Sequence, residues 1–155
     1  MPAVARRTKI LLGAPGLLIF LVISALLARA LSVDGAERSA ITALIEAEAR
    51  GDAHSMLTGI TGCAARAGCP GRVAANAKAL ARHGSVSILT LDSSAGFSLG
   101  GTLGTARVAW KTQSSLPITQ CVRVRRAGGV LKGYGIELLA ISPRIATNGV
   151  CTSVF

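Results

Sequence analysis

The sequence predicts an α+β fold in which an N-terminal transmembrane helix precedes two or three helices packed on an antiparallel sheet of about four strands. Three observations lead to this class. A long uncharged apolar stretch lies near the N-terminus, helical periodicity with cap residues follows it, and strand-like alternation fills the second half. We expect two parts: a cytoplasmic tip with a signal-anchor at residues 1–32, and an extracytoplasmic domain at residues 33–155.

The apolar stretch covers residues 10–28 and carries no charge. As a helix rising about 1.5 Å per residue it is about 28 Å long, close to the roughly 30 Å of a bilayer's hydrocarbon core. Arg6, Arg7 and Lys9 precede it, so the positive-inside rule keeps the N-terminus in the cytoplasm. We expect a single-pass anchor in the cell membrane. The alternative is cleavage near Ala30, at an Ala-Arg-Ala sequence, which would release a secreted domain.

Residues 36–50 have the periodicity of an amphipathic helix. Charged residues of this segment, including Glu37 and Glu48, are expected mostly away from its apolar stripe. The stripe consists of Ile41, Leu44 and Ile45.

Short polar and glycine-containing segments delimit the helices. Residues 32–35 are expected to break the helical pattern and to form a short linker after the membrane segment. Gly51 suits the left-handed residue that ends a helix, and Asp52 is placed to cap a second helix that reaches about Ile60. Proline and glycine then open a third helix over residues 70–82.

From Gly84 onward the pattern changes to strands. Strands are expected at residues 84–91, 105–112, 118–126 and 130–142. Residues 92–96 form a turn, residues 97–104 a glycine-rich run, and residues 127–129 a hairpin turn. Alternation in the third strand places Gln120, Val122 and Val124 opposite Cys121, Arg123 and Arg125.

The chain has four cysteines, Cys63, Cys69, Cys121 and Cys151, all of which follow the apolar stretch. An even number of cysteines in a small exported domain indicates disulfides, and four cysteines allow three pairings. We prefer Cys63 with Cys69 and Cys121 with Cys151. The first bridge would close a short loop between two helices, and the second would tie the C-terminal tail to a strand.

A zinc site is the alternative for the first two cysteines, with His54 and His83 as the other ligands. Five residues separate Cys63 from Cys69, whereas structural zinc sites usually have about two to four. Two thiolates would also need protection from pairing in an oxidising compartment. The sequence therefore favours disulfides, and we expect no metal and no cofactor.

In the order of its elements the chain resembles the nuclear-transport-factor-2-like, or cystatin-like, α+β cone over about residues 36–142. The matching features are the helix end Ala49-Arg50-Gly51-Asp52, the cysteine-containing loop, the strand Thr105–Trp110 and the hairpin at Gly128-Gly129. Val130-Leu131 stand where a Trp is common. The resemblance implies a small bacterial exported protein with one anchor, a type that includes accessory membrane proteins of lipid-import systems.

Some members of that fold are isomerases or dehydratases that use Asp, His or Tyr inside the cone. The available groups here are Asp52, His54, His83, Asp92, Tyr134 and Glu137. Asp52 is explained as a helix cap, Asp92 as a turn residue and Glu137 as part of a solvated strand face. No catalytic pair of the family maps onto these positions, so the sequence favours a protein that is not an enzyme.

The domain is basic. From Val33 onward it has roughly 13 Lys and Arg against 7 Asp and Glu. Such a charge favours anionic surfaces, and Arg123, Arg125 and Arg126 are candidate contacts for anions. A solvated strand face is the other interpretation. Because aromatic residues are not interleaved with the arginines, we expect no nucleic-acid binding.

Together these patterns predict a non-catalytic binding or assembly role, as an accessory subunit of an envelope complex. The expected partners are the membrane, a membrane protein complex or an anionic envelope polymer, and the exposed sheet allows a homodimer. The alternatives are a cone that binds a small molecule or lipid or acts as an enzyme, and a pilin-like structural subunit. The expected break in the helix at Asp34-Gly35 argues against the pilin-like alternative.

Overall fold

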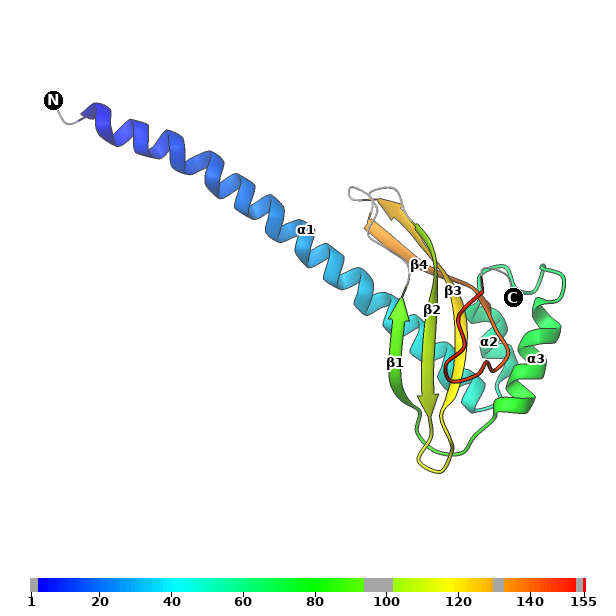
Figure 1. Cartoon of the computed structure of the whole chain (residues 1–155). Coiled ribbons are helices and arrows are strands. Elements are labelled where there is room, and N and C mark those ends of the chain that lie inside the picture. The colour runs from blue at the N-terminus through cyan, green and yellow to red at the C-terminus, as the bar shows by residue number, and fades with distance from the viewer. Residues whose placement is uncertain (1–2, 94–101, 130–132, 153–154) are drawn as a thin grey trace. The chain divides into compact units, whose positions relative to one another are not determined.

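The computed structural model describes residues 3–93, 102–129, 133–152 and 155. In chain order the elements are α1 (Ala3–Ala49), α2 (Ala53–Gly59), α3 (Cys69–Leu80), β1 (Ser87–Ser93), β2 (Thr102–Lys111), β3 (Ile118–Gly129) and β4 (Gly133–Ile141) (Figure 1). Helices thus precede an antiparallel sheet of four strands. The predicted α+β class, with an apolar N-terminal helix, is confirmed.

The chain divides into two compact units, residues 1–34 and residues 35–155. In the first unit the helix exposes a continuous run of large apolar side chains; Leu17, for example, is 62% exposed. Among the described residues, α1 is the one helix long and apolar enough to cross a membrane. A surface of this kind is unfavourable in water and suited to hydrocarbon.

The predicted linker at residues 32–35 is wrong, because these residues are helical and α1 continues to Ala49. A single glycine inside a helix costs only about 1 kcal/mol relative to alanine. Gly35 has helix-forming residues on both sides, and propagation of an existing helix is far easier than its nucleation. Two polar residues and one glycine are therefore too weak a signal to end this helix.

The core of the second unit lies between the end of α1, the helices α2 and α3, and one face of the sheet (Figure 1). We call this the inner face. Trp110 in β2 and Val122 in β3 are fully buried on it, and they pack in one cluster with Ile41 and Ile45 of α1 and Met56 of α2. The period-two and helical patterns in the sequence therefore converge on one core, as expected from the alternation of strand side chains.

The sheet is a meander with the strand order β1-β2-β3-β4. The edge strand β4 has a neighbouring segment outside the sheet. The connection between α2 and α3 runs beside β4, where the backbone N–H of Thr61 donates to the carbonyl of Leu138 at 2.7 Å. A parallel bridge joins Ile60 to the same residue. The loop that contains the first two cysteines is thus held at the edge of the sheet.

Several predicted strand boundaries moved. β1 continues through Asp92, which was assigned to a turn, because residues 87–93 pair with β2. β3 continues through residues 127–129, which were assigned to the hairpin turn, since Gly129 pairs with Gly133. The turn itself, with Val130 and Leu131, lies outside the described residues, as does most of the glycine-rich run before β2.

Candidate functional site

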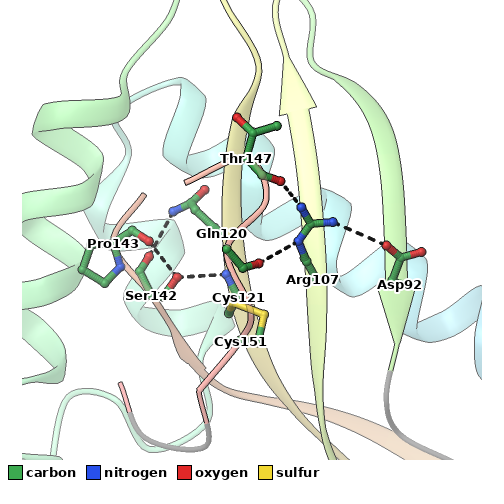
Figure 2. Close-up of a disulfide and its surroundings, with 9 residues drawn as sticks. Asp92, Arg107, Gln120, Cys121, Ser142, Pro143, Thr147 and Cys151 are labelled. Carbon is green, nitrogen blue, oxygen red and sulfur yellow. Dashed lines mark hydrogen bonds and ion pairs between the residues drawn. A yellow bond between two sulfur atoms is a disulfide. The ribbon is translucent and has the colours of Figure 1, made fainter. Parts of the chain in front are cut away.

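The two disulfides join Cys63 to Cys69 and Cys121 to Cys151, the pairing preferred from the sequence. The first closes the loop between α2 and α3. The second attaches the C-terminal tail to the outer face of the sheet, the face opposite the core (Figure 2). Zinc ligation by these cysteines would require free thiols, and all four sulfur atoms are in disulfides.

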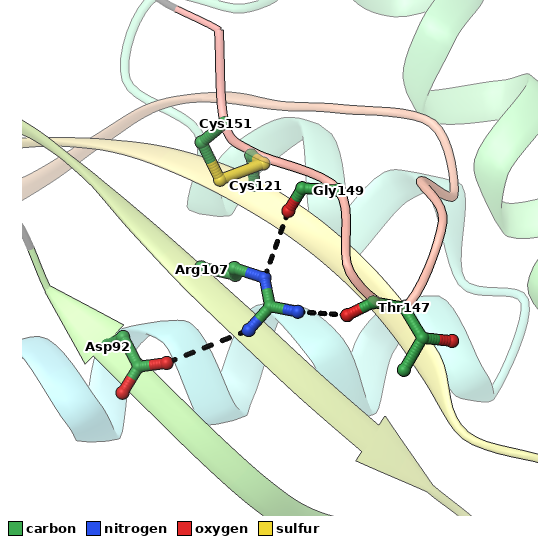
Figure 3. Close-up of polar contacts among 6 residues, drawn as sticks. All are labelled: Asp92, Arg107, Cys121, Thr147, Gly149 and Cys151. Atoms are coloured by element: carbon green, nitrogen blue, oxygen red, sulfur yellow. Dashed lines mark hydrogen bonds and ion pairs between the residues drawn. A yellow bond between two sulfur atoms is a disulfide. The ribbon is translucent and has the colours of Figure 1, made fainter.

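Arg107 of β2 holds the tail from the same face. Its guanidinium donates to the carbonyl oxygens of Thr147 and of Gly149, the latter at 3.2 Å, and its third nitrogen lies 3.8 Å from the carboxylate of Asp92 (Figure 3). The tail also pairs with β3, where the N–H of Ile145 donates to the carbonyl of Thr119 at 2.8 Å. This part of the outer face is therefore covered and its charges are paired.

Farther along the same face, beside the loop of residues 63–69, lies an open groove of about 490 Å³, which we call the first groove. Four arginines from three elements line it. Arg123 and Arg125 come from β3, Arg66 from the loop and Arg72 from α3. Its remaining lining consists of Thr61, Gly62, Ala67, Gly68, Cys69, Val73, Leu103, Leu139, Ala140, Ile141 and Phe155.

Two of the three arginines singled out from the sequence thus line this groove, but Arg126 does not. Side chains alternate along β3, so Arg126 shares the inner face with Val122 and Val124. There its guanidinium donates to the carboxylate of Glu37 through Nε at 2.9 Å. The three arginines predicted as anion contacts are therefore divided between the two faces of the sheet.

The four groove arginines differ in their partners. Arg66 donates to the carbonyls of Thr61, at 2.9 Å, and Leu139, so it fastens the loop to β4. Arg125 donates to Glu137 at 2.6 Å and forms an ion pair with it. Glu137, expected to be simply solvated, is therefore paired across the strands.

Arg72 is different. It is half-buried, and its guanidinium has no hydrogen-bond or ion-pair partner among the described residues. A cation withdrawn partly from water without a counter-charge is unfavourable, and an anion in the groove would compensate it. The guanidinium is a planar fork of donors that matches the oxygens of a phosphate or carboxylate.

Arg72 also borders a second groove, of about 600 Å³, between α3 and the chain after β4. Arg144 lines it from the chain after β4, and Asn76 lines it from α3. The other lining residues are Gly68, Gly71, Ala75, Ala79, Leu80 and Pro143.

Glu48, near the end of α1, is completely buried in the core of the domain, although a position away from the stripe was expected. Gln120 donates to its Oε1 at 2.9 Å and accepts a bond from the indole of Trp110 at 2.8 Å. Burial raises the pKa of Glu48 to about 7, against the opposing effect of the hydrogen bond from Gln120. Glu48 lines neither groove.

A signal for this burial was present in the sequence. Glu48 is four residues after Leu44 and three after Ile45, and Glu37 is four residues before Ile41, so both carboxylates lie on the apolar stripe. Their charge was given more weight than their spacing. Acidic residues are rarely buried unless they are paired or hydrogen-bonded, and both of these are.

Among the side chains that the structure describes, the predicted acid–base candidates do not meet in a common site. Asp52 caps α2, where the hydroxyl and the backbone N–H of Ser55 donate to its carboxylate and hold its pKa below the usual value. Asp92 pairs with Arg107 on the outer face. His54 lies in α2 and His83 follows α3. The side chain of Tyr134 lies outside the described part of the chain.

No protein-family model matches the chain, and neither the curated proteins nor the solved structures include a match.

Proposed function

We propose that this protein is a single-pass membrane-anchored binding domain outside the cytoplasm, which holds an anionic group of its partner in the first groove. In this role it is a non-catalytic accessory subunit of an envelope complex. Arg72 is the central contact, with Arg123 beside it, and Arg66 and Arg125 add positive charge while keeping their structural partners. The single observation that carries the proposal is that Arg72 is half-buried in the groove and its guanidinium has no partner among the described residues.

The proposed location, with the second unit outside the cytoplasm, follows from the first unit and the cysteines. Residues 10–28 are apolar and follow three basic residues, which favours a cytoplasmic N-terminus. Two disulfides in a chain of this size are typical of proteins that fold in an oxidising compartment. Both arguments favour the same orientation, with the second unit outside the cytoplasm.

We further propose that the second unit is a cystatin-like cone whose interior serves the fold and holds no ligand. Support comes from the interior itself, where Trp110, Gln120 and Glu48 are completely buried and hydrogen-bonded in series. Side chains that fill the concave side of a sheet remove the cavity that a small-molecule or enzymatic cone needs. Binding is therefore assigned to the outer face.

A pilin-like subunit is the second candidate, and one observation favours it. α1 continues without a break from Ala3 to Ala49, and its last turns pack on an antiparallel sheet with a disulfide-bound tail. This candidate requires filaments, so electron microscopy of sheared cell-surface material tests it. Filaments containing this protein would support it, and only dispersed protein would contradict it.

The first groove is tested with the full chain in neutral-detergent micelles, labelled with ¹⁵N at arginine. Titration with inorganic phosphate should shift the Arg72 Nε–H resonance saturably. Arg72→Gln should abolish saturable binding, because it removes the unpaired cation. The control is Lys78→Gln, which removes the same charge from an exposed position on α3 outside both grooves. Unchanged phosphate binding in Arg72→Gln would contradict the proposal.

A further inference from the structure

The two grooves share two lining residues, Gly68 and Arg72, at the beginning of α3. One groove extends from this point toward β3 and β4, and the other along α3 toward the chain after β4. We infer that the two grooves form one continuous track that binds a linear phosphate-bearing polymer, with Arg144 as a contact beyond the first groove. This inference rests on the proposed function, since it deepens the role of Arg72.

The charge of the track has one sign. Its arginines are Arg66, Arg72, Arg123, Arg125 and Arg144. Among the described residues that line either groove there is no Asp or Glu. Concave surfaces lined by one sign of charge concentrate the field and attract ligands of the opposite sign. Arg144 is exposed and, like Arg72, has no side-chain partner in the described ranges.

The track is longer than one anionic group. The second groove follows α3 from Gly71 to Leu80 along Ala75, Asn76 and Ala79, at the spacing of one helix face. Nine steps of about 1.5 Å make this length about 13.5 Å, more than twice the width of a single phosphate. The small side chains along it leave a shallow channel rather than a closed pocket. Such a shape fits an extended chain with charges at intervals.

The side chains that line the track favour one class of polyanion over the others. Guanidinium groups bind phosphate oxygens in pairs, which gives arginine an advantage over lysine at such sites. Phe155 is the one aromatic residue among the described residues of the track. Single-stranded nucleic acids are normally held by stacking of several bases on aromatic side chains. A phosphate polymer without bases therefore fits better than RNA or DNA.

The experiment measures affinities of the full chain in neutral-detergent micelles for linear inorganic polyphosphate and for orthophosphate. Polyphosphate should bind about 100-fold more tightly, with a steeper dependence of affinity on salt, because more counterions are released. Arg144→Gln should weaken polyphosphate binding about tenfold and leave orthophosphate binding unchanged. Arg38→Gln, at an exposed position of α1 outside both grooves, is the matched control and should change neither affinity.

The outcomes separate this inference from the function on which it rests. Equal affinities for the two probes, or no effect of Arg144→Gln, would overturn the track and leave the first groove intact, provided that orthophosphate still requires Arg72. Loss of all phosphate binding in the native chain would overturn both. Tighter binding of single-stranded DNA or of polyglutamate with matched charge would overturn the assignment to a phosphate polymer without bases.

Discussion

The charged side chains on the two faces of the sheet differ in whether they have partners within the protein. On the inner face each buried carboxylate has a hydrogen-bond donor inside the protein: Arg126 for Glu37, and the amide of Gln120 for Glu48. On the outer face the tail covers one part and pairs its charges, whereas the groove beside it contains Arg72 without a partner among the described residues. Charge on the inner face is therefore structural, and charge in the groove is available for binding.

The largest expected effect comes from breaking the inner-face pair of Glu37 and Arg126. Glu37 is 1% exposed and Arg126 is 12% exposed. Removing one member of a buried pair usually costs about 3–5 kcal/mol, because the other is left without compensation. Arg126→Gln should lower the free energy of unfolding by about that amount. Urea unfolding in micelles, followed by the fluorescence of the single Trp110, measures it.

The ion pair on the outer face should contribute much less to stability than the pair on the inner face. Arg125 and Glu137 have the same chemistry but are 51% and 32% exposed. Exposed pairs contribute about 1 kcal/mol or less. Arg125→Gln should therefore cost far less than Arg126→Gln in the same assay. Equal losses for the two variants would contradict the division between the faces.

Removal of the two disulfides should lower the free energy of unfolding by different amounts. The bridge from Cys121 to Cys151 spans 30 residues and that from Cys63 to Cys69 spans 6. Loop entropy in the unfolded chain gives about 3.5 kcal/mol for the first and about 2 kcal/mol for the second. Urea unfolding of the two Cys→Ser double variants should follow this order. A larger loss from the short bridge would show that the loop beside the groove matters more than the tail.

The buried Glu48 makes stability depend on pH. Its pKa is raised from 4.5 to about 7, so between these values the folded protein keeps a proton that the unfolded chain releases. The free energy of unfolding should therefore fall as the pH rises through this window, by about 3 kcal/mol in total. Glu48→Gln should remove most of this dependence.

A pH series of urea unfolding curves for the native chain and Glu48→Gln tests this point. The matched control is Glu46→Gln, which removes a carboxyl from an exposed position on the same helix. A native stability that rises between pH 4.5 and 7, or Glu48→Gln with the same slope as the native chain, would contradict the assignment.

The sequence predicts local elements well where the pattern is regular. The alternation through Gln120, Val122 and Val124 separated the two faces of β3 correctly, and the chain positions of the cysteines led to the observed pairing. It failed at Gly35, because a weak helix breaker was read without the helix-forming residues on both sides. Glu48 was missed although its spacing places it on the apolar stripe, since burial of a carboxylate depends on partners from distant segments.

The candidate site was predicted only in part. Arg123 and Arg125 could be chosen because they alternate on one strand, and alternation should also have separated Arg126 from them. No local pattern indicated Arg72 or Arg144. Both belong to the grooves because the packing of α3 and the path of the chain after β4 bring them there, and such positions follow from tertiary structure alone.

The most direct test of the division between the faces compares Arg72→Gln with Arg126→Gln, each measured for both phosphate binding and unfolding free energy. Arg72→Gln should lose saturable phosphate binding and change stability by less than about 1 kcal/mol. Arg126→Gln, measured where it is folded, should keep phosphate binding and lose about 3 kcal/mol or more. If Arg126→Gln does not fold, Glu37→Gln serves in its place. Phosphate binding that persists in Arg72→Gln, or that is lost from the folded inner-face variant, would contradict the account.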